Sequence, residues 1–194
     1  MNLRVKEIFY SLQGEGDRQG EASIFIRLAQ CNLRCDFCDT DFSGGNMMTL
    51  EQIAEQIQPY PCRWIIWTGG EPMLQLTEEI VSFFKQKGFL QAIESNGHYR
   101  LPKNLDYTVV SPKGNYDYAK KINPQVDEIR FPIQKGDALP NKTRLPEAKN
   151  YFLSPVFTND EKMTKANIDY CVSQIKQHSE WRLSVQLHKL IGIE

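Results

Sequence analysis

Three of the five cysteines, Cys31, Cys35 and Cys38, lie within one eight-residue segment. An odd number of cysteines with this spacing is a poor disulfide framework, and in a reducing compartment such a group favours a metal site. Three thiolates on one short loop can bind three irons of a four-iron cluster. The fourth iron then has no protein ligand and can bind a small molecule. The spacing therefore predicts a [4Fe–4S] cluster with one open coordination position.

A tetrahedral zinc site is the main alternative for the same three cysteines. Structural zinc takes four closed protein ligands, and the three histidines, His98, His178 and His188, all lie far from this segment in the sequence. Cys62 is a distant candidate for a fourth ligand. We otherwise expect Cys62 and Cys171 to be buried structural thiols, because free cysteine packs as a small apolar side chain.

A second group of residues follows a strand that we expect over residues 63–67. Glycines expose backbone carbonyls and permit close approach to a ligand, so the segment Gly69-Gly-Glu-Pro72 indicates a binding loop. The polar segments 94–97, 111–113 and 154–155 also lie at the ends of expected strands. The carboxyl ends of parallel strands build the ligand site of an α/β sheet. We therefore expect these segments and the cysteines to lie together.

Hydrophobic periodicity predicts the elements that would position these segments. Thr49 as a cap, with Gln52 three residues later, predicts a helix to about residue 58, and Gly88 is a natural end for a helix over 74–87. The other expected elements are strands at 23–29, 63–67, 89–94, 106–110, 128–131, 151–153 and 182–187 and a helix at 164–178. Three main helices are too few for an eight-fold barrel. The prediction is an α/β fold, a partial TIM-like barrel of about six mostly parallel strands and about three main helices, in one domain over residues 1–194.

Composition and charge restrict the class of protein. The chain is 41% hydrophobic and 24% charged, which is typical of a soluble globular domain with a real core. A formal net charge of -1 gives no support to a nucleic-acid or membrane-surface partner. Residues 1–10 contain no long apolar run, so no signal peptide is expected, and no apolar stretch reaches the roughly 18 residues that span a bilayer. The expected location is the cytoplasm.

Arg27 is a charged residue inside the expected apolar strand at 23–29. An unpaired charge there would be costly, so the guanidinium needs an anionic partner. That partner is either a carboxylate of the protein or a carboxylate of a substrate, since arginine suits bidentate recognition of either one.

The cysteine spacing, with Phe37 directly before the last cysteine, resembles the signature of the radical S-adenosylmethionine (SAM) superfamily, and Gly69-Gly-Glu-Pro72 resembles its second motif. The resemblance implies that the open iron chelates the amino and carboxylate groups of the methionine of SAM. The reduced cluster then passes an electron to the sulfonium, which yields a 5′-deoxyadenosyl radical. The aromatic residue would pack near the adenine.

A closer resemblance, from about residue 3 to the end of the chain, is to the 7-carboxy-7-deazaguanine synthase family. It implies conversion of 6-carboxy-5,6,7,8-tetrahydropterin into 7-carboxy-7-deazaguanine with loss of ammonia, for queuosine-type pathways. It also implies bound Mg2+, a homodimer, and a flavodoxin- or ferredoxin-type reductant. The residues that carry it are Leu12-Gln-Gly-Glu-Gly16, Arg27, Cys38-Asp-Thr40, Thr68-Gly-Gly-Glu-Pro72, Ser111-Pro-Lys113 and Gln186-x-His188-Lys189.

The resemblance assigns a role to each matching residue. The cluster ligands would be Cys31, Cys35 and Cys38, and Thr40 would bind Mg2+ through its hydroxyl. The substrate would contact Leu12, Gln13, Gly14, Glu15, Arg27, Thr68, His188 and Glu194. SAM would contact Phe37, Cys38, Asp39, Gly70, Glu71, Ser111, Pro112, Lys113, Ser154, Pro155, Val156 and Phe157. The match at 154–157 is weaker, because the family has a more polar segment there. No catalytic side chain beyond the cluster and cofactor is implied.

The end of the chain gives a further expectation. His188 lies at the end of the strand expected at 182–187, and Leu190-Ile-Gly-Ile193 is too apolar for a tail left in water. We expect this segment to fold back over the substrate pocket. The α-carboxylate of Glu194 would then lie against the pterin, where it can accept hydrogen bonds from amino and ring N–H donors.

Two other functions fit parts of the sequence. The nearer one is a radical SAM activase of a glycyl radical enzyme, which acts on a protein and would not need Arg27. The farther one is a binding or electron-transfer module with an iron–sulfur or zinc site, which predicts no affinity for SAM.

Overall fold

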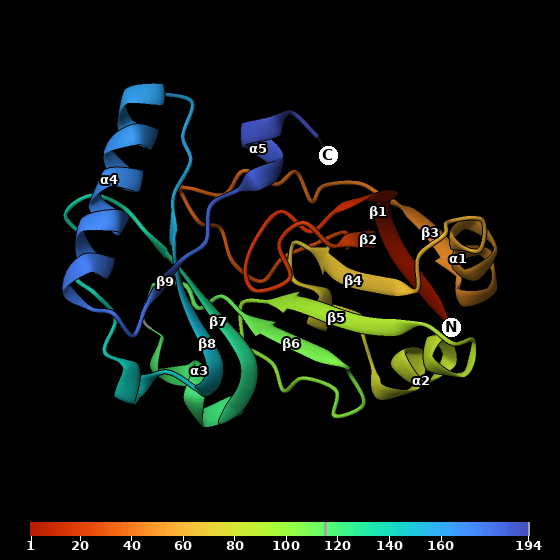
Figure 1. Ribbon diagram of the computed structural model, residues 1–194. Helices are drawn as coiled ribbons and strands as arrows, with labels where there is room; N and C mark the ends of the chain where they lie inside the picture. The colour runs from red at the N-terminus through yellow and green to blue at the C-terminus, as the bar shows by residue number, and fades with distance from the viewer. Residues whose placement is uncertain (115, 194) are drawn as a thin grey trace.

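The structure, a computed structural model, describes residues 1–114 and 116–193, and within them it has one nine-stranded sheet (Figure 1). The strand order is β3-β1-β2-β4-β5-β6-β7-β8-β9. β1 is antiparallel to both of its neighbours, and every pair from β2 to β9 is parallel. The strands are β1 (Asn2–Leu12), β2 (Ala22–Leu28), β3 (Asn46–Thr49), β4 (Trp64–Gly69), β5 (Leu90–Ser95), β6 (Tyr107–Val110), β7 (Gln125–Ile133), β8 (Glu147–Pro155) and β9 (Arg182–Leu183).

The helices are few and lie at the margins of the sheet. In Figure 1, α1 and α2 lie beside the first half of the sheet and α4 lies beside β8 and β9. The helices are α1 (Leu50–Ile57), α2 (Glu78–Gln86), α3 (Asp117–Ile122), α4 (Glu161–Gln177) and α5 (Leu187–Ile191), with 3₁₀ turns at Pro72–Leu74 and Lys142–Arg144. None of the helices in the described part of the chain has both the length and the apolar character needed to cross a membrane.

The β1–β2 loop, residues 13–21, shows that the sheet is curved. Gln13 donates to Glu94 on β5 at 3.0 Å, and the Asp17 N–H donates to Glu128 on β7 at 3.0 Å. The Gly16 N–H donates to Ser184, next to β9, at 2.9 Å. One short loop reaches three strands only if the sheet wraps around it. The predicted incomplete barrel is therefore confirmed, although the described sheet has nine strands rather than about six.

The outer face of the sheet packs against α1 and α2. Thr49 caps α1 as predicted, because its hydroxyl accepts from the Gln52 N–H and the Gln52 side chain accepts from the Thr49 N–H. This capping box fixes the direction in which the helix leaves β3. The buried side chains of Ile53 on α1 and Phe84 on α2 join the core beside Trp67 of β4. Burial of each such side chain contributes about 1.5–3 kcal/mol.

Two expected boundaries are wrong. The helix expected over 74–87 begins only at Glu78, because Thr77 provides the cap by accepting from the Ile80 N–H. The residues before it form the 3₁₀ turn at Pro72–Leu74 under a cap from Glu71. α4 begins at Glu161, three residues before the expected start, under an Asp160 cap.

The last expected strand is wrong beyond its first two residues. β9 ends at Leu183. The Ser184 hydroxyl then accepts from the Gly16 N–H, and the Leu187 N–H donates to the Gly14 carbonyl at 2.9 Å. These contacts turn the chain away from the sheet, and residues 187–191 form the short helix α5. His188 is therefore a helix residue.

Candidate active site

A cavity of about 640 Å3 opens at the carboxyl ends of the parallel strands. Its walls come from β1, β2, β4, β5, β7 and β8, from the cysteine loop, and from α5. The polar segments that follow separate strands are therefore brought together, as expected. The residues expected from the sequence that line it are Leu12, Gln13, Gly14, Glu15, Arg27, Cys35, Phe37, Cys38, Asp39, Thr40, Thr68, Gly70, Ser111, Lys113, Ser154, Pro155, Val156, Phe157 and His188.

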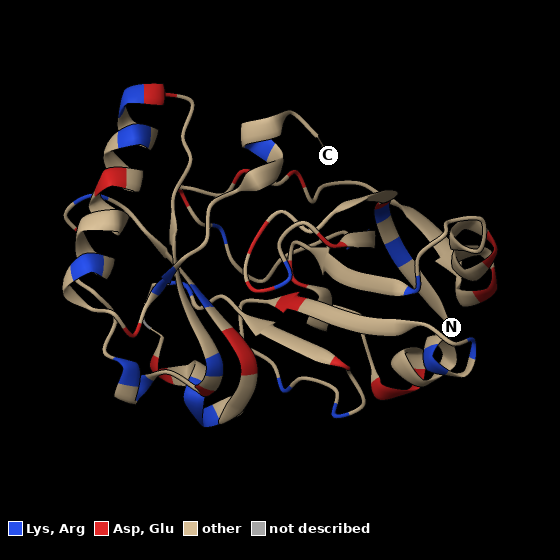
Figure 2. Cartoon of the chain, in the orientation of Figure 1, with Lys and Arg blue, Asp and Glu red and all other residues tan. Residues whose placement is uncertain are grey.

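Three expected site residues that the structure describes do not line this cavity: Cys31, Glu71 and Pro112. Glu194 lies outside the described residues. The charged residues around the cavity are mixed in sign, and Figure 2 shows Lys and Arg interspersed with Asp and Glu over the whole chain.

The cysteine loop carries three unpaired thiols. Cys31 and Cys35 are half-buried and Cys38 is exposed. Burial raises the pKa of both Cys31 and Cys35, and the negative charge of neighbouring thiolates adds to the effect. Bound iron would reverse this, because coordination deprotonates a thiol. Among the described residues, no three Cys, His, Asp or Glu side chains converge on one point. A four-iron cluster does not need such convergence, because each thiolate binds a different iron.

The double glycine Gly69-Gly70, at the end of β4, packs against the backbone that leads into the cysteine loop. The Gly70 N–H donates to the Leu28 carbonyl at 3.2 Å, and the Glu71 N–H donates to the Gln30 carbonyl at 2.9 Å. A Cβ on Gly69 would lie 2.0 Å from the Leu28 carbonyl oxygen, and one on Gly70 would lie 2.1 Å from the Gln30 oxygen. The glycines therefore allow close approach to the backbone that leads into the cysteines. Gln30 itself has a φ of 77°, a left-handed conformation that costs a non-glycine residue about 1–2 kcal/mol.

Glu71 is fully buried and turned away from the cavity. Its carboxylate accepts from the Met73 N–H, the Ser95 hydroxyl and the Asn96 N–H, at 2.8–3.0 Å. Burial raises its pKa, whereas these donors lower it. The Asn96 side chain in turn donates to Asn32 of the cysteine loop at 2.8 Å. Glu71 thus joins the segment after β5 to the segment after β4.

Arg27 has a protein partner and a place in the cavity wall. Its Nε donates to Glu7 Oε1 at 2.6 Å, and its side chain is 22% exposed. In the parallel register, Arg27 lies opposite Thr68, which also lines the cavity. A guanidinium has five N–H donors, so the contact with Glu7 leaves capacity for a carboxylate in the cavity.

Lys113 and Thr40 both line the cavity. The Lys113 ammonium donates to Ser111 Oγ at 2.8 Å and lies 5.6 Å from the centre of the Phe37 ring. Burial lowers the pKa of Lys113. The Thr40 hydroxyl lies 3.4 Å from Asp39 Oδ1, and Asp41 follows it in the chain. This corner therefore offers the oxygen donors that a hard cation prefers.

The helix α5 closes one side of the cavity. Lys189 forms an ion pair with Asp39 of the cysteine loop, and Gln186 donates to Asp39 and to Glu15 at 3.3 Å. A Cβ on Gly14 would lie 2.2 Å from His188 Nδ1, so glycine lets the His188 ring pack directly on the β1–β2 loop. Burial lowers the pKa of His188.

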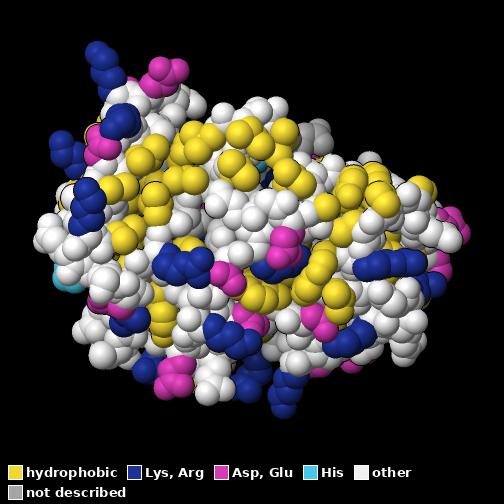
Figure 3. All heavy atoms as spheres, in the orientation of Figure 1, with side chains coloured by type: hydrophobic (Ala, Val, Ile, Leu, Met, Phe, Trp, Pro, Cys, Tyr) yellow, Lys and Arg dark blue, Asp and Glu magenta, His cyan; other side chains and the backbone are white. Residues whose placement is uncertain are grey.

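The apolar end of the chain is not covered as expected. Leu190, Ile191 and Ile193 are 56%, 53% and 37% exposed. Figure 3 shows apolar side chains at the surface where α5 lies. The segment lies beside the pocket, where His188 and Lys189 line the cavity, but its apolar side chains stay exposed to water, contrary to the expectation.

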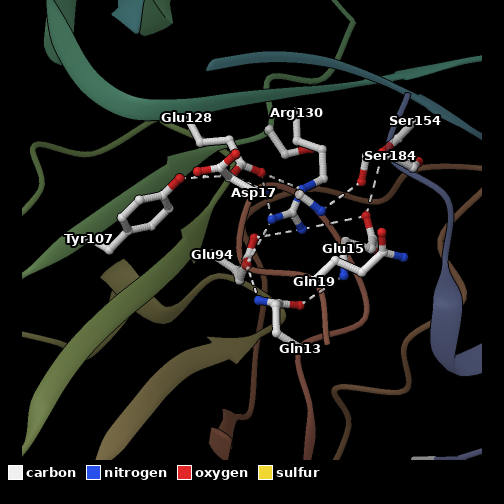
Figure 4. Close-up of polar contacts among 12 residues, drawn as sticks. Gln13, Glu15, Asp17, Gln19, Glu94, Tyr107, Glu128, Arg130, Ser154 and Ser184 are labelled. Carbon is white, nitrogen blue, oxygen red and sulfur yellow. Dashed lines mark hydrogen bonds and ion pairs between the residues drawn. The ribbon is translucent and has the colours of Figure 1, made fainter. Parts of the chain in front are cut away.

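From the sequence, Glu94 is expected only as part of the polar segment 94–97, and Glu128 and Arg130 only as residues of a strand. With Glu15 they form a carboxylate network around one guanidinium at the base of the cavity (Figure 4). Glu128 and Arg130 lie in an apolar strand, which is the same signal that drew attention to Arg27. Their alternation on one face of β7 could have identified the pair, but not its distant partners.

Comparison with known proteins identifies the family. The model of the Radical SAM superfamily matches residues 26–175. A 7-carboxy-7-deazaguanine synthase from Bacteroides thetaiotaomicron is 37% identical over the whole of both chains, and one from Haemophilus influenzae is 39% identical over all of this chain and 95% of that one. This chain belongs to the 7-carboxy-7-deazaguanine synthase family. The crystal structure of QueE from Escherichia coli has the same fold, with a TM-score of 0.73 and 24% identity over 97% of this chain and 95% of that chain.

Membership of the 7-carboxy-7-deazaguanine synthase family settles the class of chemistry. The chain is a radical SAM enzyme of the lyase type, with a [4Fe–4S] cluster and SAM as its cofactors. The zinc-module and activase alternatives are not favoured by full-length similarity to these synthases. The free thiols of Cys31, Cys35 and Cys38 on one loop fit the cluster that the family uses.

Proposed function

We propose that the chain converts 6-carboxy-5,6,7,8-tetrahydropterin into 7-carboxy-7-deazaguanine with loss of ammonia, as a step of queuosine-type 7-deazapurine biosynthesis. One observation carries the proposal: a single cavity joins the cysteine loop to a cationic wall at Arg27 and an acceptor-rich base at Gln13, Glu15 and Glu94. A carboxylated pterin has the matching groups, namely one carboxylate and an edge rich in N–H donors.

The part of the cavity around Arg27, Gln13, Glu15 and Glu94 is assigned to the substrate from the chemistry of these side chains. Arg27 pairs with the substrate carboxylate, because a guanidinium binds carboxylates in a bidentate manner. Glu15 and Glu94 accept from the N–H donors of the ring, and Gln13 can both donate and accept. Thr68 and His188 lie on the cavity wall beside them. The other predicted contacts are Leu12 and Gly14, and the predicted contact of Glu194 concerns a residue outside the described chain.

The cofactor end is assigned to the cysteine loop and the segments beside it. When bound, the cluster and SAM supply the radical that removes one hydrogen from the substrate. Phe37, Gly70 and Lys113 contact the cofactor. The cavity wall holds the substrate so that one hydrogen lies within reach of the radical, and it excludes water. The remaining predicted contacts on the cavity wall are Cys38, Asp39, Ser111 and residues 154–157.

We also propose an Mg2+ site at Thr40. Its hydroxyl and the nearby Asp39 and Asp41 carboxylates are oxygen donors of the kind that Mg2+ takes. In the structure, Asp39 pairs with Lys189 and Asp41 pairs with Lys6, and these ion pairs keep both carboxylates beside the cavity. Mg2+ there would orient and neutralise the substrate carboxylate. Equilibrium dialysis with Mg2+, comparing the native chain with Thr40→Val, tests the site; equal binding by the two would contradict it.

The remaining parts of the proposal concern partners and location. We propose a homodimer, a flavodoxin- or ferredoxin-type reductant, and no nucleic-acid or membrane partner, on the basis of the family resemblance and the near-neutral charge. A cytoplasmic location suits unpaired cysteines, which a reducing compartment maintains. Light scattering on the reconstituted protein tests the dimer, and reduction by purified flavodoxin or ferredoxin tests the electron donor.

Anaerobic incubation of the reconstituted enzyme with the pterin, SAM and a reductant tests the main proposal. The expected result is 7-carboxy-7-deazaguanine and ammonia in equal amounts, identified by mass spectrometry and an ammonia assay. Parallel reactions without SAM and without reductant are the controls. Cleavage of SAM with the pterin left unchanged would contradict the proposed substrate while leaving the radical SAM chemistry intact.

A further inference from the structure

Arg130 is the centre of the carboxylate network, and its side chain is only 8% exposed. Its guanidinium nitrogens lie 2.8 Å from Glu128, 3.1 Å from Glu94 and 3.4 Å from Glu15. Figure 4 shows the three carboxylates around this one cation. Burial of a charge is costly unless it is paired and hydrogen-bonded, so each of these contacts matters. Three carboxylates around one guanidinium also leave an excess of negative charge at the base of the cavity.

The three carboxylates are not equivalent. Glu128 is 1% exposed and lies behind the cavity wall, where the Tyr107 hydroxyl and the Asp17 N–H each donate to it at 3.0 Å. Glu15 and Glu94 are 18% and 19% exposed and line the cavity. The network therefore has one hidden carboxylate and two that face a bound molecule, with Arg130 between them.

The surrounding backbone is fitted to this network. Gly16 has a φ of +75°, and a Cβ there would lie 2.1 Å from Glu128 Oε1 and 2.7 Å from Arg130 Nη2. The β1–β2 loop can thus press onto the buried ion pair only because residue 16 is glycine. The same loop presents Gln13, whose side chain donates to Glu94 at 3.0 Å. The position of the loop, and of the acceptors that it carries, depends on the ion pair beneath it.

We propose that Arg130 is a positioning residue: with Glu128 as its buried counter-charge, it holds Glu15 and Glu94 side by side and sets the charge that the base of the cavity presents to the pterin. The inference deepens the proposed function and rests on it. A planar guanidinium suits this task, because its donors point in fixed and different directions. A lysine could pair with one carboxylate but could not fix three.

The electrostatics agree with this geometry. The pKa of Glu94 is raised to about 7: burial is the largest cause, the charges of Glu128 and Glu15 add to it, and Arg130 opposes them. Glu94 therefore changes its charge near neutral pH, and the balance between Arg130 and Glu128 decides at which pH it does so. The titratable groups around the network are Glu15 from the loop, Glu128 and Arg130 from β7, Tyr107 from β6, Lys113 after β6 and His188 from α5.

Two substitutions should shift this balance in opposite directions. Arg130→Met removes the cation and so raises the pKa of Glu94. The acid limb of the plot of kcat/KM for the pterin against pH should therefore move to higher pH by about one unit or more. Glu128→Gln removes a neighbouring negative charge, so the limb should move to lower pH by about one unit. Arg130→Lys keeps the positive charge but loses the planar guanidinium. It should shift the acid limb less than Arg130→Met does. A purely structural role for Arg130 predicts lower activity but no opposite shifts.

Asp127→Asn is the matched control for Glu128→Gln. Asp127 directly precedes Glu128 on β7, faces the other side of the strand, and pairs with the exposed Lys149 at 2.7 Å. It should leave the pH profile where it is. If Arg130→Met does not fold, because it leaves three carboxylates without a cation, Arg130→Lys and Glu128→Gln still give opposite predictions. Shifts in the same direction, or no shift, would overturn the proposal.

An infrared titration of the cluster-loaded protein without pterin separates this inference from the proposed function. The protonated carboxyl band of Glu94, assigned by its loss in Glu94→Gln, should titrate near pH 7 in the native chain. Its midpoint should rise in Arg130→Met and Arg130→Lys and fall in Glu128→Gln. If the enzyme does not turn over the pterin but these shifts occur, the proposed substrate is wrong and the positioning role stands. If turnover occurs and the midpoint does not move, the positioning role is wrong.

Discussion

The two ends of the cavity are built in different ways. The cysteine loop draws its three thiols from one short segment, and they are exposed or half-buried. The carboxylate network draws Glu15, Glu94 and Arg130 from three distant segments and buries most of their surface. The loop depends on an added cofactor to become a site, whereas the network is assembled by the fold itself. Local chemistry can thus be placed on one short loop, whereas a charge cluster of this kind needs several segments of the fold to bring its members together.

Removing a cysteine should give the largest effect. Cys31→Ala, Cys35→Ala and Cys38→Ala should each abolish the cluster and all turnover, since three thiolates are the protein's full contribution to a four-iron cluster. Iron analysis and the absorbance of anaerobically purified protein measure the loss. Cys62→Ala and Cys171→Ala are the matched controls and should keep about four irons. A stoichiometric zinc content in the native protein, without iron, would refute the cluster.

Arg27→Lys should have the next largest effect, on the substrate end. A lysine keeps the charge but cannot reproduce a bidentate contact with a carboxylate. We expect kcat/KM for the pterin to fall about 10²-fold, which corresponds to about 2.7 kcal/mol. Formation of 5′-deoxyadenosine should fall much less than formation of product. An equal fall in both would mean that Arg27 acts only through its pair with Glu7.

The contrast between the two ends also explains what could be predicted. The cysteine spacing and the Thr49 cap depend on neighbours in the sequence, and both predictions agree with the structure. The strands β1 and β3 were not predicted, although the alternation of apolar Leu3 and Val5 with polar residues was a signal for β1. The contact between Glu94 and Arg130 spans 36 residues, and no local pattern encodes such a contact. The strand expected over 182–187 ends already at Leu183, because the Leu187 N–H donates to the Gly14 carbonyl, far away in the sequence.

Gly70→Ala tests whether the loop depends on the fold beneath it. The new Cβ would lie 2.1 Å from the Gln30 carbonyl, which is backbone and cannot yield as a side chain does. Such overpacking costs about 1–3 kcal/mol and should displace the residues that lead into Cys31. We expect a lower melting temperature and a lower iron content. Gly20→Ala is the control, since its Cβ meets nothing within 4 Å and it carries only the cost of a positive φ. Equal iron contents in the two variants would contradict the dependence.

The smallest effect that we predict is a pH dependence of stability at the carboxylate network. The pKa of Glu94 in the folded chain is raised to about 7, so its neutral form is favoured by folding. That contribution is fully present below the unfolded pKa, about 4.3, and is lost as pH rises through 7. Glu94→Gln is neutral at every pH and lacks this loss. Urea unfolding of both proteins should show the native chain losing about 1–3 kcal/mol relative to the variant between about pH 5 and pH 8. Parallel curves would show that Glu94 is ionised throughout this pH range, and that burial in the network does not raise its pKa.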